Sequence, residues 1–145
     1  AEPLLLRAYE IQKQILKEPH PDFADTLRKF GWLYERKGEL EKAEYHQKQA
    51  LDMIRRLFGP EHPELIWIFE SIGSVSVKLD KTDQAMKAFK EQERICRCIG
   101  RNDLLAKSLR NQATVLMQTG RTRKAKALAR EADGYQKNDE KGKER

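Results

Sequence analysis

Residues 20–53 read HPDFADTLRKFGWLYERKGELEKAEYHQKQALDM, and this stretch decides the fold. Its first half carries an apolar stripe at the helical spacing i, i+3, i+4, i+7. That stripe consists of Leu27, Phe30, Gly31 and Tyr34. The residues KGEL at 37–40 interrupt the pattern, and a second stripe follows. The second stripe consists of Leu40, Ala43, Ala50 and Leu51. The stretch therefore predicts two amphipathic helices joined by a short turn.

The same two-helix pattern recurs along the chain. A shift of 42 positions aligns Gly31 with Gly73, and a further shift of 40 aligns Gly73 with Ala113. The alanines at 43, 85 and 125 follow the same two shifts. The two missing positions fall in a turn, where deletions are tolerated. Small residues at these places let paired helices approach closely. The sequence thus predicts three helix-turn-helix units preceded by one helix.

This periodicity sets the expected boundaries. Helices are predicted near residues 3–17, 21–37, 40–57, 63–79, 82–98, 103–119 and 122–136. We expect residues 1–17 to be the second helix of a truncated repeat, followed by repeats at 18–58, 59–99 and 100–136. The remaining residues, 137–145, are charged and are expected to be a frayed tail.

Composition excludes several classes of function. The net charge is +6, but 23 acids are interspersed with 29 bases, which is typical of a solvated helix surface and disfavours a nucleic-acid site. No segment approaches the ~20 apolar residues that cross a membrane. Cys96 and Cys98 lie two positions apart, so on a helix they point away from each other and pair poorly. A reduced, cytoplasmic location is the simplest expectation.

Two histidines raise the possibility of a metal or acid–base site. His20-Pro21-Asp22 and His62-Pro63-Glu64 stand 42 positions apart, at the same place in two repeats. Proline suits the first turn of a helix, and an acid there favours its positive end. We therefore interpret both triplets as turns between repeats, too far apart to hold one ion.

Other catalytic signals are weak. The chain contains no glycine-rich phosphate loop, nucleophile elbow or HExxH motif. The basic neighbours of Cys96-Arg97-Cys98 could favour a thiolate, but no histidine follows nearby as a base. The sequence predicts a protein that is not an enzyme and that has no metal or cofactor.

The repeats resemble tetratricopeptide repeats, in the long form found in kinesin light chains and many bacterial proteins. The resemblance rests on residues 20–53 together with AEPLLLRAYEI at 1–11 and FGPEHPELIWIFESIG at 58–73. Residues 85–113 resemble the tandem repeats of large bacterial signalling proteins. The resemblance implies an all-α fold, a right-handed α-solenoid of about seven helices.

In this family the first helix of each repeat lines a concave groove, which implies a set of partner-binding residues. These are Arg28, Lys29, Trp32, Arg36, Trp67, Glu70, Ser74, Lys78, Lys107, Arg110, Asn111 and Gln118. Asp25, Glu35, Ser71 and Thr114 lie on the same stripes. Trp32 and Trp67 are the only tryptophans, and they either anchor a ligand side chain or fill space between repeats. The basic residues could hold carboxylates.

One feature departs from the resemblance. Kinesin light chains typically carry paired asparagines where this chain has Arg28-Lys29 and Glu70-Ser71, and only Asn111 resembles them. Cargo recognition of the kinesin type is therefore not expected. We expect instead a protein-interaction module, or scaffold, for a partner with acidic and bulky apolar residues. The alternatives are a sensor segment of a larger signalling ATPase and, less favoured, a nucleic-acid-binding protein.

Overall fold

The computed structural model describes residues 2–15 and 19–144, and every regular element in these ranges is a helix. The seven helices are α1 (Glu2–Ile15), α2 (Pro21–Lys37), α3 (Leu40–Phe58), α4 (Glu64–Lys78), α5 (Thr82–Ile99), α6 (Asn102–Gln118) and α7 (Thr122–Lys143). The predicted all-α class is confirmed. Residues 16 and 17, expected at the end of the first helix, lie outside the described residues.

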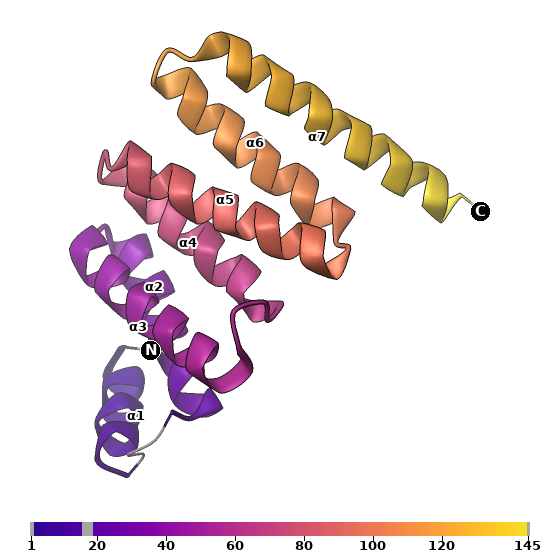
Figure 1. Ribbon diagram of the computed structural model, residues 1–145. Coiled ribbons are helices and arrows are strands. Elements are labelled where there is room, and N and C mark those ends of the chain that lie inside the picture. Colours follow the sequence, from indigo (N-terminus) through magenta and orange to yellow (C-terminus); the bar gives the residue numbers. More distant parts are fainter. Residues whose placement is uncertain (1, 16–18, 145) are drawn as a thin grey trace.

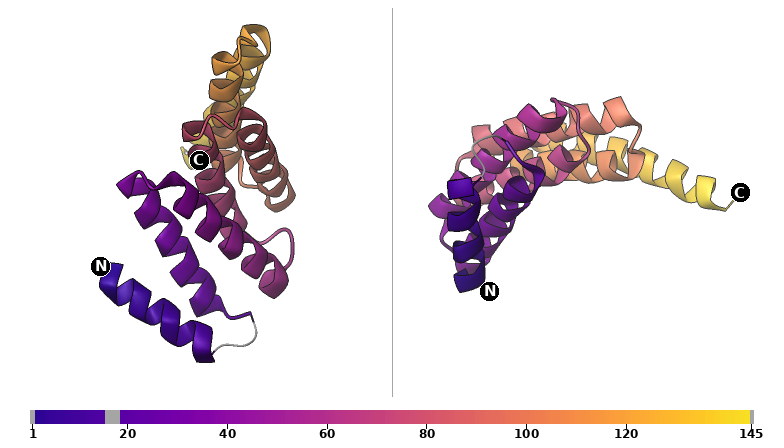
Figure 2. Two further views of the ribbon diagram at one scale, coloured as in Figure 1. Left: turned by 90° about the vertical axis from the view of Figure 1, so that its left-hand side faces the viewer. Right: turned by 90° about the horizontal axis from the view of Figure 1, so that it is seen from below.

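The helices stack in chain order into a curved solenoid (Figures 1 and 2). Each helix packs mainly against the next one in the chain, and α2 also contacts α4. Helix α1 lies at one end of the stack and α7 at the other (Figure 1). Helices α2, α4 and α6 form one layer of the repeats, and α3, α5 and α7 form the other.

The apolar stripes predicted from the sequence form the core. Leu27 and Phe30 are each 1% exposed, and Leu65 and Leu109 are fully buried. The repeated alanines at 43, 85 and 125 are also buried. Because each stripe faces the neighbouring helices, the core runs along the stack and buries one side of every central helix.

Two glycines allow helices to cross at very short range. A Cβ atom at Gly31 would lie 2.5 Å from the Cγ atom of Gln47, and one at Gly73 would lie 2.3 Å from the Phe89 ring. These contacts join α2 to α3 and α4 to α5. At the equivalent place in the third pair, the chain has Ala113 on α6 and the small Ala129 on α7.

The turns within the three helix pairs share one backbone conformation. Gly38, Asp80 and Gly120, which are related by the two shifts, have φ values of 78°, 58° and 78°. Glycine adopts this left-handed region without strain, whereas Asp80 does so at some cost. The glycine at position 38 therefore ends α2, and this helix end can be predicted from the sequence.

Both histidines shape helix starts, as the sequence predicted. The Nδ1 atom of His20 accepts a hydrogen bond from the backbone N–H of Asp22 at 3.1 Å. His62 accepts one from the backbone N–H of Glu64 at 3.2 Å. Each ring thus satisfies a backbone donor that has no partner within its helix.

The last helix is longer than predicted. α7 continues to Lys143, whereas the sequence indicated a frayed tail from residue 137. Lysine, glutamate and glutamine favour helices even where nothing packs on them. Tyr135 also packs against the core, and Gln136 donates to Glu140 one turn later. The charged composition was therefore the wrong signal for the end of this helix.

Candidate functional site

A shallow cavity of about 230 Å³ lies between α2 and α4. Arg28, Lys29 and Trp32 line it from α2, and Trp67 and Ser71 line it from α4. These five positions all lie on the stripes that the family resemblance assigned to a groove. The structure therefore brings together the part of the predicted set that contains both tryptophans.

Both tryptophans present about half of their surface to water. Trp32 is 56% exposed and Trp67 is 45% exposed. The guanidinium carbon of Arg36 lies 4.7 Å from the centre of the Trp32 ring, and Lys107 Nζ lies 5.9 Å from that of Trp67. About half of each tryptophan thus packs against the protein, and the other half is open to solvent. The exposed halves offer apolar surface flanked by cations.

The charges beside the cavity are only partly balanced. Asp25 pairs with Lys29 at 2.8 Å and with Arg28 at 2.7 Å. Hydrogen bonds from Lys29 and Arg28 lower the pKa of the Asp25 carboxyl, which is therefore ionised at neutral pH. Arg28 also lies 3.9 Å from Glu64. Arg28 and Lys29 thus face the carboxylates of Asp25 and Glu64, and the cation beside the tryptophans that has no ion pair among the described residues is Arg36.

Other predicted groove residues hold the helices together. Glu35 accepts a hydrogen bond from Ser74 Oγ at 2.9 Å and pairs with Lys78 at 3.0 Å. Only 14% of the Glu35 side chain is exposed. Because Glu35 is on α2 and the other two are on α4, this cluster fixes the spacing of the two helices that carry the tryptophans.

Helix α6, the third helix of this layer, contributes less to the cavity of the tryptophans than α2 and α4 do. Lys107 on α6 pairs with Glu70 on α4 at 2.7 Å. Arg110 turns toward α7, where it lies 3.2 Å from Asp133 and lines a separate cavity of about 290 Å³. Asn111 is partly buried and Gln118 is exposed, and neither lines the cavity of the tryptophans. The structure therefore does not bring the whole predicted set together in one site.

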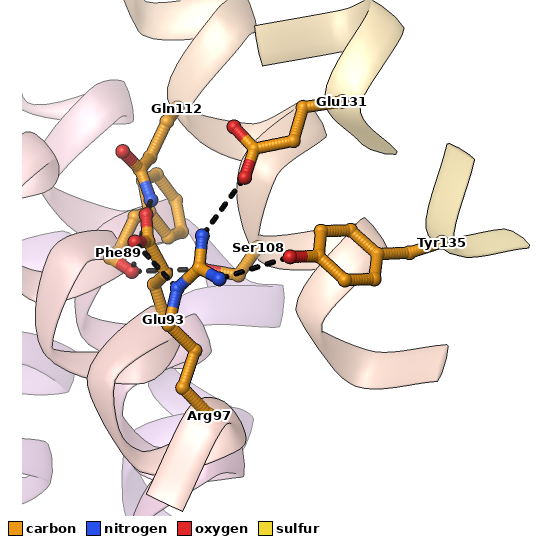
Figure 3. Close-up of polar contacts among 7 residues, drawn as sticks. All are labelled: Phe89, Glu93, Arg97, Ser108, Gln112, Glu131 and Tyr135. Carbon is orange, nitrogen blue, oxygen red and sulfur yellow. Dashed lines mark hydrogen bonds and ion pairs between the residues drawn. The ribbon is translucent and has the colours of Figure 1, made fainter. Parts of the chain in front are cut away.

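A polar network that the sequence did not reveal ties α5 to α6 and α7 (Figure 3). Arg97 donates to Glu93 at 3.1 Å, to Glu131 at 2.9 Å and to Tyr135 at 3.0 Å. Gln112 on α6 donates to the other oxygen of Glu93 at 2.8 Å. Arg97 was noted in the sequence only as a neighbour of two cysteines. Its partners on α7, Glu131 and Tyr135, lie more than 30 positions away, beyond any local pattern.

Cys96 is poorly suited to thiol chemistry. Cys96 is fully buried, and burial raises the pKa of its thiol to about 11. A thiolate is therefore rare there at neutral pH. Within residues 2–15 and 19–144, no three His, Cys, Asp or Glu residues are placed to hold a metal ion. None of the helices described is long and apolar enough to cross a membrane.

Comparison with known proteins places the fold. A family model described as tetratricopeptide repeat matches residues 1–56 and 36–97. A search of curated proteins gave no match. Among solved structures, BtubC (BKLC) from P. vanneervenii superposes with a TM-score of 0.87 at 17% identity, covering 92% of this chain and 54% of that one.

Two further structures are similar. The repeats of a putative kinesin light chain from Podosopora anserina give a TM-score of 0.82 at 16% identity, over 96% of this chain and 66% of theirs. The N-terminal domain of stress-induced protein-1 (STI-1) from C. elegans gives 0.67 at 15% identity, over 79% and 84%. The chain thus spans between half and two thirds of the first two structures. At these identities the likeness concerns the fold, which is that of kinesin-light-chain-like repeats. Since the family model covers more than half of the sequence, the chain belongs to the tetratricopeptide repeat family.

Proposed function

We propose that this chain is a non-catalytic interaction module that binds a protein segment in the cavity between α2 and α4. One observation carries the proposal. Two half-exposed tryptophans from different helices meet at a single cavity, which Arg28 and Lys29 also line and beside which Arg36 lies over the Trp32 ring. Members of the tetratricopeptide family mostly serve in protein interactions, which agrees with this assignment.

The chemistry of the cavity indicates its ligand. Tryptophan and arginine are enriched among the residues that dominate protein interfaces, because large rings exclude water from their surroundings. A bulky apolar side chain would lie against Trp32 and Trp67. Acidic side chains next to it would meet Arg28 and Lys29, which share Asp25. Arg36 forms no ion pair with any described residue and is available for a further carboxylate.

Rigid support favours this use of the cavity. The pairs from Glu35 to Ser74 and Lys78 hold α2 against α4 at one level of the groove. A binding site whose walls are already fixed loses less conformational entropy when a ligand enters. Glu35, Ser74 and Lys78 do not line the cavity, but they hold in place the two helices that form its walls.

Affinity capture tests the proposal. Equal amounts of the wild-type chain, Trp67→Ala and Tyr45→Ala would serve as bait, and the retained proteins would be identified and compared. Tyr45 is a matched control because it is an aromatic side chain, 58% exposed, on α3 outside the cavity. We expect a partner retained by the wild type and by Tyr45→Ala but lost with Trp67→Ala. Equal retention by all three baits would contradict the proposed site.

A further inference from the structure

The positive charge of the chain is concentrated in one short segment. Residues 121–130 contain five basic residues and no acid, so they carry five of the chain's net six charges. The basic residues are Arg121, Arg123, Lys124, Lys126 and Arg130. Each of the helices α1 to α6 has an acidic residue in its first turn, and α7 has none. Cations there oppose the helix dipole and cost stability.

These charges also lack compensation from the rest of the fold. None of the five forms an ion pair with a carboxylate of the described residues, and all are exposed. Farther along the same helix, Glu131 pairs with Arg97 at 2.9 Å and Asp133 pairs with Arg110 at 3.2 Å. At the turn between α4 and α5, Lys81 pairs with Glu44 at 2.8 Å. The start of α7 therefore differs from comparable places in the molecule.

Helix α5 extends the positive surface. Lys87 and Lys90 are exposed and likewise have no carboxylate partner among the described residues. The Arg97–Glu131 pair shows which sides of α5 and α7 face each other. Lys90 lies seven residues, or two turns, before Arg97, and Lys124 lies seven residues before Glu131. The two lysines therefore occupy corresponding sides of the two helices. Arg97 and Glu131 attract each other, whereas the residues two turns before them are both basic.

A furrow with an apolar floor and charged walls, which include Arg55 and Glu91, adjoins this surface. A cavity of about 540 Å³ lies between α3 and α5, with Phe69 and Ile72 of α4 lining it. Lys87 lines the same furrow, so it belongs to both features. The furrow and the cations lie on the layer of α3, α5 and α7, whereas the cavity of the tryptophans is formed by α2 and α4.

We propose that α5 and α7 form a second docking surface, which binds an acidic protein segment carrying at least one bulky apolar side chain. The apolar side chain enters the furrow beside Lys87. The carboxylates meet Lys90 and the basic residues of 121–130, where they relieve the repulsion among these cations. A protein segment fits better than single-stranded nucleic acid. Among the described residues, Lys87, Lys90 and the cations of 121–130 lie over no aromatic ring, and the Phe69 ring in the furrow is only 4% exposed, too little for a base to stack on it.

The test compares three probes on the intact chain. They are a short fluorescein-labelled polyglutamate peptide, the same peptide with two central leucines, and a labelled oligothymidylate of equal charge. Fluorescence anisotropy at low salt gives the affinity for each. We expect the leucine peptide to bind most tightly and to weaken as salt rises, since exposed charges are screened. Oligothymidylate binding more tightly than both peptides, or no binding of either peptide, would overturn the proposal.

Matched charge variants locate the surface. One variant replaces four cations of α7 by glutamine, which preserves helix propensity. It carries Arg123→Gln, Lys124→Gln, Lys126→Gln and Arg130→Gln. The control removes four exposed cations outside α5 and α7, as Arg7→Gln, Lys13→Gln, Lys42→Gln and Arg56→Gln. We expect the first variant to lose about tenfold or more in affinity and the control to lose much less. Equal losses would show that only net charge matters and would overturn the proposal.

A further measurement separates this surface from the tryptophan cavity. Trp32 and Trp67 are the only tryptophans, and both lie in the other layer. Because the proposed function gives the cavity a ligand of the same kind, the peptide titration is repeated with Trp67→Ala. Affinity that Trp67→Ala keeps and the α7 variant loses would assign the peptide to the second surface. Affinity that Trp67→Ala loses and the α7 variant keeps would assign it to the cavity and overturn the second surface.

Discussion

The ring of Phe89 on α5 lies directly against the backbone of Gly73 on α4. A Cβ atom at Gly73 would be 2.3 Å from Cε1 and 2.5 Å from Cζ of that ring. Real Cβ atoms do not approach carbon so closely, and Phe89 is itself only 4% exposed. The crossing of these two helices thus depends on the absence of a side chain at one position.

We predict that Gly73→Ala lowers the free energy of unfolding by about 1–3 kcal/mol, because the ring must move within a packed core. Gly134→Ala is the control. Gly134 is an exposed helical residue with nothing near its missing Cβ, so alanine there should add about 0.5–1 kcal/mol. Denaturant unfolding measures both. Equal changes in the two variants would show that α4 and α5 do not cross at Gly73.

Two buried glutamines provide a second comparison. Among the described residues, neither polar atom of the Gln47 side chain has a hydrogen-bond partner. Gln92 lacks a partner only at its side-chain oxygen, since its amide nitrogen donates to the backbone oxygen of Ile66 at 3.2 Å. Burying an amide without a partner is costly. We predict that Gln47→Met raises the free energy of unfolding by about 1 kcal/mol and that Gln92→Met lowers it by a similar amount. Denaturant titration of both variants tests this difference, and the opposite signs would refute it.

The histidines should be replaceable by another capping residue. Asparagine can accept the same backbone hydrogen bond as His20 and His62, and alanine cannot. The double asparagine variant should keep the stability of the wild type, and therefore its melting temperature. The double alanine variant should lose about 1 kcal/mol of unfolding free energy per site. Zinc retained by the wild type after dialysis, but absent from the asparagine variant, would show a metal role instead.

Acid should weaken the start of α6. A hydrogen bond from Arg101 lowers the pKa of the Asp103 carboxyl from 3.8 to about 2. Because the folded-state pKa is below that of the unfolded chain, the carboxylate stabilises the fold above about pH 4 and loses this effect as pH falls toward 2. Asp103→Asn should therefore cost a little stability at neutral pH and nothing near pH 2. A cost that is constant with pH would contradict this role.

The fold could be predicted because its determinants are local and repeated. The helical spacing of Leu27 and Phe30, and the small residues at 31, 73 and 113, follow from the sequence alone. The end of α7 could not be predicted from charge, since lysine and glutamate extend a helix as readily as they solvate a tail. The division of the chain into repeats at 18–58, 59–99 and 100–136 remains a proposal.

The candidate site could be predicted from the sequence only in part. The stripes placed Trp32 and Trp67 on one layer, but their meeting at one cavity depends on how α2 and α4 are spaced. Ion pairs within the fold determine which cations are available to bind a ligand. Such pairs cannot be predicted from local sequence, since partners such as Glu35 and Lys78 lie 43 positions apart. The charge of residues 121–130 was visible in the sequence, but the average over the whole chain concealed it.

The most direct test of the proposed function uses the tryptophans themselves. Since both line the cavity and the chain has no others, their emission reports on that place alone. A partner obtained by affinity capture would be titrated into the wild-type chain, with emission and acrylamide quenching recorded beside calorimetry. We predict that the emission maximum shifts to shorter wavelength and that acrylamide quenching falls, both saturating with the calorimetric affinity, because a bound apolar side chain excludes water from the rings. Calorimetric binding with unchanged emission and unchanged quenching would contradict this prediction.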